Sequence, residues 1–137
     1  MGIITDIGTI CVAALFGAMV FFPAVVAPTV FKTLAAEEAG LFLRRLFPAY
    51  YAFMIVTAGI GTICLIGRPL IAAGLGLVAL TTLGVRQWLV PKINGWRDAE
   101  LQGDTGAAKN FAVGHRASVI VNMAQLAFVG FALITLV

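Results

Sequence analysis

The chain has 137 residues, of which 61% are hydrophobic and 11% charged, whereas soluble domains carry about 25% charged residues. Together with a mean hydropathy of +1.05, this composition excludes a water-soluble fold. The net charge is +3, but in a membrane protein basic residues chiefly determine orientation, so the charge implies no nucleic-acid partner. Four apolar stretches without a large polar segment predict a single domain over residues 1–137 that is embedded in a lipid bilayer.

The first apolar stretch, residues 7–31, predicts a transmembrane helix. It contains no charged residue in 25 positions, and at ~1.5 Å per residue it can cross a ~30 Å hydrocarbon core. No basic residue precedes it, so we expect a retained helix rather than a cleaved signal peptide. Pro23 and Pro28 predict a kink in its second half. Residues 32–45 are polar and are expected to form a connector, at most with a short interfacial helix.

Three further helices follow in the predicted order. They are expected over about residues 46–66, 70–90 and 110–137. A tight turn is expected at residues 67–69, and Pro91 predicts a break or bend after the third helix. Residues 91–110 are the extended polar region. Because the connections are short, we expect an all-α integral membrane protein with four transmembrane helices in an up-and-down bundle.

The distribution of basic residues predicts the orientation of this bundle. Four spans place the first and third loops on one side, and the termini and second loop on the other. Eight of the nine basic residues belong to the first side: Lys32, Arg44, Arg45, Arg86, Lys92, Arg97, Lys109 and Arg116. Cytoplasmic loops carry the excess of Lys and Arg. We therefore expect an inner or plasma membrane protein with both termini outside the cytoplasm.

A polar stripe on the fourth helix is the main candidate site. Its members are spaced four, three, four and three residues apart, and so share one helical face; they are Phe111, His115, Ser118, Asn122 and Gln125. Polar side chains in a membrane segment should face the bundle interior. There they could line a pocket, or they could bond neighbouring helices at ~0.6 to 2 kcal/mol per bond.

A second polar cluster follows the third helix, on the same side of the membrane as His115. It comprises Pro91, Lys92, Asn94, Trp96, Arg97 and Asp98. Such groups can bind an anionic headgroup or a carboxylate, although an ordinary solvated anchor with an Arg97–Asp98 pair would look the same. Arg86 is expected either to reach the headgroups or to turn toward the stripe.

No metal site or cofactor is predicted. His115 is the one side chain of a type that titrates near neutral pH, which makes it the candidate for proton transfer or ligation. A metal would need two or three further donors, so haem or copper is only an alternative. Packing is the expected role of the sulfur-bearing residues in the apolar stretches, which are Cys11, Cys64, Met19, Met54 and Met123.

Three segments resemble a known family. Residues 21–51, 91–99 and 111–126 are similar, in order and spacing, to the bacterial relatives of eukaryotic transmembrane protein 205, a small four-helix membrane family of unknown function. The F-x-x-x-H-x-x-S-x-x-x-N pattern from Phe111 to Asn122 is the most specific part of this resemblance. A looser similarity to anthrone-oxygenase-like membrane proteins rests on Pro91, Asn94 and the His115–Arg116 pair. It would imply a small-molecule pocket with His115 as general base.

The expected function is non-catalytic binding or movement of a small solute or lipid-like molecule in a cleft open to the cytoplasm. The expected ligand-binding residues are His115, Ser118, Asn122, Gln125, Asn94, Arg97 and Arg86. The alternatives are a small enzyme or cofactor protein that uses His115, and a structural or assembly protein. Homo-oligomers are also compatible with the sequence, through close packing at Gly17, Gly59, Gly61, Gly74 and Gly76.

Overall fold

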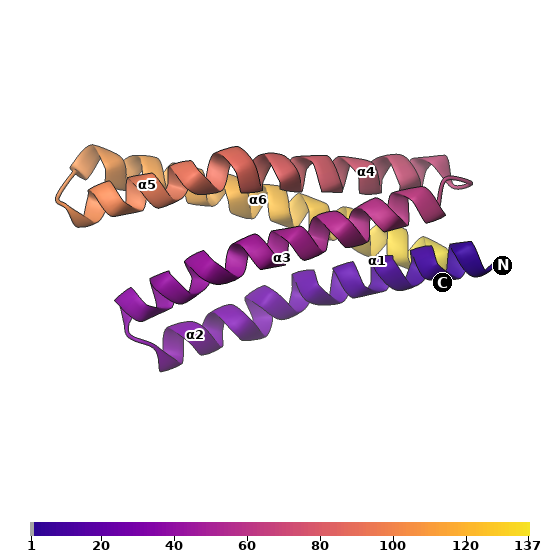
Figure 1. Ribbon diagram of the computed structural model, residues 1–137, viewed down its shortest axis with the longest axis horizontal. Helices are drawn as coiled ribbons and strands as arrows, with labels where there is room; N and C mark the ends of the chain where they lie inside the picture. The colour runs from indigo at the N-terminus through magenta and orange to yellow at the C-terminus, as the bar shows by residue number, and fades with distance from the viewer. Residues whose placement is uncertain (1) are drawn as a thin grey trace.

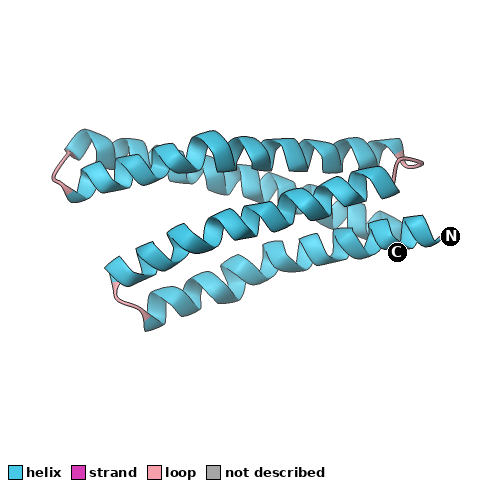
Figure 2. Ribbon diagram, in the orientation of Figure 1, coloured by secondary structure: helices cyan, strands magenta, loops and turns pink. Residues whose placement is uncertain are grey.

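A computed structural model describes residues 2–137, which form four long helical rods joined by short turns (Figures 1 and 2). The elements in chain order are α1 (Ile3–Phe21), the π-helical turn η1 (Phe22–Val26), α2 (Ala27–Thr33), α3 (Ala36–Cys64), α4 (Pro69–Gly84), the π-helical turn η2 (Val85–Leu89), α5 (Val90–Leu101) and α6 (Thr105–Leu136). Within the described residues there is no strand.

Each of the four rods is long and apolar enough to cross a membrane. They are Ile3–Thr33, Ala36–Cys64, Pro69–Leu101 and Thr105–Leu136, each with a segment of mean hydropathy between 1.6 and 2.5. The rods run up and down, so both termini lie at the same end of the molecule (Figure 1). The predicted fold class, an all-α membrane bundle of four helices, is confirmed.

The helices are longer than the sequence predicted. The second helix begins at Ala36 rather than near residue 46, so the expected polar connector is reduced to residues 34–35. The third rod does not end at Pro91 but continues to Leu101, and the fourth begins at Thr105 rather than near residue 110. Polar ends of a helix can project beyond the hydrocarbon, where charged side chains are solvated. The apolar stretches therefore marked the membrane segment and not the whole helix.

Two π-helical turns let the first rod continue past Pro28 and the third rod past Pro91, whereas Pro48 lies inside the regular helix α3. η1 ends two residues before Pro28, and η2 ends two residues before Pro91. In each case the residue just before the proline donates its backbone N–H to the carbonyl oxygen of the residue five positions earlier. Ala27 donates to Phe22, and Val90 donates to Val85. A proline in a regular helix lacks a donor and clashes with the preceding turn. The wide turns accommodate this locally, in the place where the sequence predicted a kink or break.

The end of the bundle that carries the termini is tightly packed. Leu15, Met19, Met54, Leu75 and Val129 are fully buried there, from α1, α3, α4 and α6. Burial of Met19 and Met54 fits the packing role expected for them. On α4, Gly74 lies where the ring of Phe128 on α6 occupies the space that a Cβ would need. These two helices therefore approach closely at this position.

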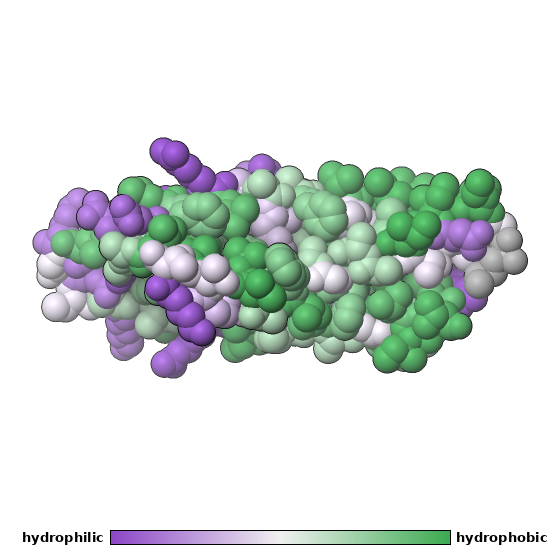
Figure 3. All heavy atoms as spheres, turned by 90° about the horizontal axis from the view of Figure 1, so that it is seen from below, coloured by the Kyte–Doolittle hydropathy of each residue, from purple (hydrophilic) through white to green (hydrophobic). Residues whose placement is uncertain are grey.

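The opposite end is more polar and less tightly joined. Hydrophilic residues gather at this end, whereas the rest of the visible face is mostly apolar (Figure 3). Here the rods separate into two pairs, α2 with α3 and α5 with α6 (Figure 1). Within the second pair, the Trp96 ring packs on Gly114. The space between the pairs holds the candidate site.

Candidate ligand-binding cleft

A cavity of about 380 Å³ lies between the two helix pairs at the polar end. This volume falls within the range of about 300–1,000 Å³ that is typical of small-molecule sites. The lining side chains from the first pair and η1 are Phe22, Pro23, Ala27, Phe31, Leu43, Phe47, Tyr50 and Tyr51. Those from the second pair are Val90, Ile93, Asn94, His115, Ser118, Val119, Asn122 and Met123. The wall is mainly apolar with a few polar groups, as in most ligand sites.

Three polar residues of the predicted stripe line the α6 side of the cavity. His115, Ser118 and Asn122 share one face of this uninterrupted helix. The Ser118 hydroxyl donates a hydrogen bond of 2.7 Å to the His115 carbonyl oxygen. The His115 ring stacks on Phe111, with 5.9 Å between ring centroids and 12° between ring planes. This stacking restricts the orientation of the imidazole at the entrance of the cleft.

An aromatic cluster forms the opposite side of the cavity. The Phe22 ring of η1 stacks on Tyr50 with 4.6 Å between centroids, and it lies 5.2 Å from Phe47. The Phe47 ring in turn stacks on Tyr51 at 5.6 Å. The cluster fastens η1 to α3 and provides a stiff apolar wall. The phenol group of Tyr50 is directed toward the Asn122 amide on the far side.

The cavity brings together four of the seven side chains expected to bind a ligand. Asn94 of α5 joins the three residues of α6. Gln125 does not line it: this side chain is only 8% exposed, and its Nε2 donates to the hydroxyls of Thr81 at 2.7 Å and Thr82 at 3.1 Å. For Gln125 the structure therefore supports the interhelical bonding role, between α6 and α4.

Arg86 and Arg97 also lie outside the cavity lining. Arg86 is directed neither at the stripe nor away from the protein, since its Nε donates to the carbonyl oxygen of Pro48 on α3 at 3.3 Å. Arg97 bonds Glu100 at 2.7 Å and lies over the Phe111 ring, 5.4 Å from its centroid. The Arg97–Asp98 pair, which belonged to the alternative interpretation as a solvated anchor, does not form: Arg97 pairs with Glu100 and Asp98 with Arg44.

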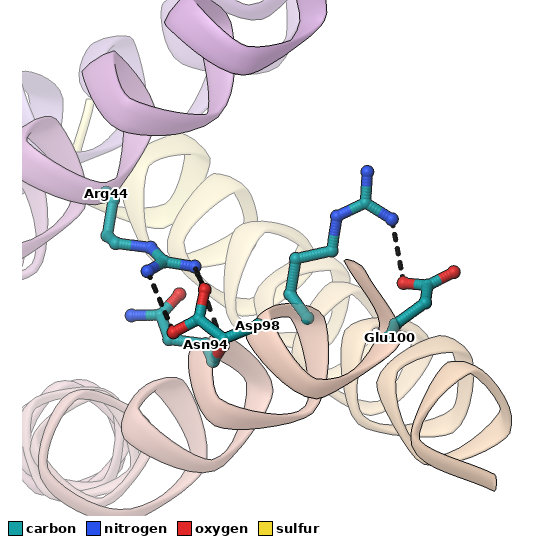
Figure 4. A network of polar contacts seen from close by, with 5 residues as sticks. Arg44, Asn94, Asp98 and Glu100 are labelled. Atoms are coloured by element: carbon teal, nitrogen blue, oxygen red, sulfur yellow. Dashed lines mark hydrogen bonds and ion pairs between the residues drawn. The ribbon is translucent and has the colours of Figure 1, made fainter. Parts of the chain in front are cut away.

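Asp98 instead joins the two halves of the cleft. It accepts two hydrogen bonds from the Arg44 guanidinium of α3, at 2.8 and 3.1 Å (Figure 4). Arg44 also reaches the carbonyl oxygen of Asn94 at 3.5 Å. The two side chains are 36% and 52% exposed, so water screens the pair and it contributes little to folding stability. Its geometric effect is to hold α3 against α5 at the cavity rim.

The aromatic cluster was the part of the site that sequence analysis missed. None of Phe22, Phe47, Tyr50 and Tyr51 was among the residues expected to bind a ligand. The signal was their spacing on α3, because residues three and four apart share a helical face. Phe47 is related to Tyr50 and Tyr51 in this way.

No group of three or more His, Cys, Asp or Glu side chains that could hold a metal ion occurs in the part of the chain that the structure describes. His115 is the single histidine of the sequence. Its neighbours in the cavity are aromatic, amide, hydroxyl and apolar groups. These groups can bind an organic molecule through hydrogen bonds and apolar contact.

Fold and site together define a multi-pass, four-helix membrane protein with a cleft at its polar end. The family described as "Domain of unknown function (DUF4149)" matches residues 10–101, and the chain belongs to this family. The match includes η1, α3 and α5 from the cleft, whereas α6 lies beyond it.

An uncharacterized protein of Aquifex aeolicus (strain VF5) is similar to part of the chain. The two are 33% identical over 76 residues, which cover 55% of this chain and 58% of the relative. The chain thus spans less than two thirds of that protein. No solved structure matches the chain.

Gln125 bonds α4 whereas Asn122 lines the cavity, so a substitution at Gln125 should change stability and not ligand binding. Gln125→Leu removes the bonds to Thr81 and Thr82, so we expect the free energy of unfolding to fall by about 1 kcal/mol. We expect no change in ligand binding at the cleft, because Gln125 does not line it. The unfolding midpoint in detergent and the binding of an amphipathic probe measure the two effects. Loss of probe binding at unchanged stability would place Gln125 in the site instead.

Proposed function

We propose that the protein binds a small amphipathic molecule in the cleft at its polar end, as a binding or transfer protein and not as an enzyme. The observation that best supports this function is the composition of the cavity wall. One side, on η1 and α3, is aromatic, and the other side, on α5 and α6, carries a row of polar residues. An apolar body would pack against the first side. Its polar group would accept or donate hydrogen bonds at Asn94, His115, Ser118 or Asn122.

The contrast within α6 supports this assignment. Gln125, one turn nearer the packed end, has its amide engaged by two threonine hydroxyls. Asn122 and Ser118 lie at the cavity wall, half-buried. Polar groups at membrane depth that face a cavity are typical of sites for ligands or solutes.

The resemblance to the bacterial relatives of transmembrane protein 205 adds to the proposal. Its most specific pattern, from Phe111 to Asn122, lies in α6, where three of its members line the cavity and the fourth stacks on His115. We propose that the chain is a member of that group. The pattern would then mark ligand-contacting positions.

Alanine substitution at the polar row tests the binding proposal. We expect His115→Ala and Asn122→Ala each to weaken photolabelling by a diazirine-bearing alkyl alcohol about tenfold, because a lost hydrogen bond of ~1 to 1.5 kcal/mol corresponds to that factor. The label should map by mass spectrometry to residues 22–31 and 115–123. Asn110→Ala is the matched control, since Asn110 is exposed on the same helix outside the cavity.

The proposal fails if the three variants label equally, or if the label is spread evenly over the lipid-facing surface. Thermal unfolding in the same detergent separates binding from folding. Should the two cleft variants unfold while Asn110→Ala does not, the polar row serves helix packing instead.

We further propose that the polar end faces the cytoplasm of a cell with an inner or plasma membrane, and that both termini lie outside. Support comes from the basic residues, of which only Arg68 belongs to the end that carries the termini. Alkaline phosphatase fused after Val137 should therefore be active and a green fluorescent protein fusion dark. The reverse result would invert the orientation and turn the cleft outward.

A further inference from the structure

The polar groups in the cleft favour a ligand whose headgroup accepts hydrogen bonds. Five of the six polar side chains that line it have donors for a ligand: the hydroxyls of Tyr50 and Tyr51, the amides of Asn94 and Asn122, and the imidazole of His115. The sixth, Ser118, already donates its hydroxyl hydrogen to the His115 carbonyl oxygen. No carboxylate is among the described lining residues. A site rich in donors and without negative charge suits a carboxylate or phosphate oxygen better than an ammonium group.

The charged residues around the polar end also favour a ligand with an anionic headgroup. Two acidic side chains near the rim are already paired, Asp98 with Arg44 and Glu100 with Arg97. A third, Asp104, caps α6 by accepting a hydrogen bond from the Ala107 N–H. Glu37 and Glu38, in the first turn of α3, have no ion pair among the described residues. The same holds for six cations of this end, so that its basic residues exceed its acidic ones by eight to five; these cations are Lys32, Arg45, Arg86, Lys92, Lys109 and Arg116. The resulting positive potential attracts anionic headgroups.

The sides of the cleft differ in how they are closed. On the side of α3 and α5, Arg44 and Asp98 connect the two helices. On the side of α2 and α6 the described residues show no such link, and these helices do not pack along one another. Phe31 of α2 and Val119 and Met123 of α6 line the cavity and are still 64%, 43% and 43% exposed.

This gap lies at the depth of the hydrocarbon. About 20 residues of a helix span the apolar core, and α6 carries no charged residue after Arg116, so residues 117–136 form its apolar segment. Val119 and Met123 therefore face lipid, so the gap between α2 and α6 connects the cavity with the bilayer interior. Lys32 directly follows Phe31, and Arg116 directly follows His115. Consecutive residues of a helix point about 100° apart and neither cation lines the cavity, so Lys32 and Arg116 lie at the height of its polar groups, one on each helix of the gap, without facing into it.

We propose that the ligand is a single-chain amphiphile with an anionic carboxylate or phosphate headgroup, and that it enters from the membrane between α2 and α6. The inference rests on the proposed binding function and adds the headgroup and the route. A cavity of about 380 Å³ lies at the small end of ligand sites, which suits one chain rather than a whole two-chain phospholipid. The headgroup takes the polar row, and the chain packs on Phe22 and Phe47.

Competition in nanodiscs of zwitterionic lipid tests the headgroup. The full chain is loaded with dansyl-undecanoate and challenged with dodecanoate, dodecyl phosphate, dodecanol, dodecyltrimethylammonium and butanoate. We expect the two long-chain anions to displace the probe at concentrations at least tenfold lower than dodecanol does, and the cation and butanoate to be weaker still. Lys32→Gln combined with Arg116→Gln should remove most of this preference, whereas Lys109→Gln should not.

The outcomes separate this inference from the function on which it rests. Equal displacement by dodecanol and dodecanoate would overturn the anionic headgroup but leave amphiphile binding intact. Displacement by butanoate alone would indicate a soluble anion. If dansyl-undecanoate does not bind in the cleft, because His115→Ala and Asn122→Ala leave its fluorescence unchanged, the proposed function fails as well.

A bulky side chain at the gap tests the route. Val119→Trp should slow the association of dansyl-undecanoate at least fivefold, since residue 119 borders the gap between α2 and α6. Ile120→Trp is the matched control, because Ile120 is 68% exposed on the same helix and does not line the cavity. Equal association rates for both variants and the native protein would contradict entry between α2 and α6.

Discussion

A proline inside a membrane helix has no N–H for the carbonyl of the preceding turn, and lipid offers no substitute donor. At Pro28 and at Pro91 a π-helical turn accommodates this constraint, whereas Pro48 lies inside the regular helix α3. One turn belongs to each helix pair that encloses the cleft. An extra residue in a turn rotates the side chains beyond it by about 100° relative to a regular helix. The wide turns thereby determine which side chains of α2 and α5 face the cavity.

The cleft depends on a difference in packing between the two ends of the bundle. At the end with the termini, a glycine such as Gly74 lets helices approach closely around a core of fully buried side chains. At the other end the helix pairs touch through the Arg44–Asp98 pair and through Arg86, which donates to the Pro48 carbonyl. Polar and charged contacts at a rim are weaker than apolar packing. The resulting structure is rigid at one end and adaptable at the end where a ligand would bind.

The features that could be predicted from the sequence are those that need only one uninterrupted helix. The stripe of His115, Ser118 and Asn122 follows from helical spacing, and α6 runs from Thr105 to Leu136 without a break. Hydropathy likewise predicted four spans, although it underestimated the helices by missing their polar ends. Features that depend on pairing between helices could not be found in this way. The orientation of Arg86 depends on the Pro48 carbonyl oxygen of α3, and the division of the stripe at Gln125 follows from two threonines on α4.

A structure determined with a brominated ligand would show whether an amphiphile occupies the space between the two helix pairs. With 12-bromododecanoate bound in lipid, we expect one bromine signal at the aromatic cluster near Phe22 and Phe47, with the carboxylate at the polar row of α6. A structure in which α3 and α6 close on each other, with bromine found only among the surrounding lipids, would contradict this expectation.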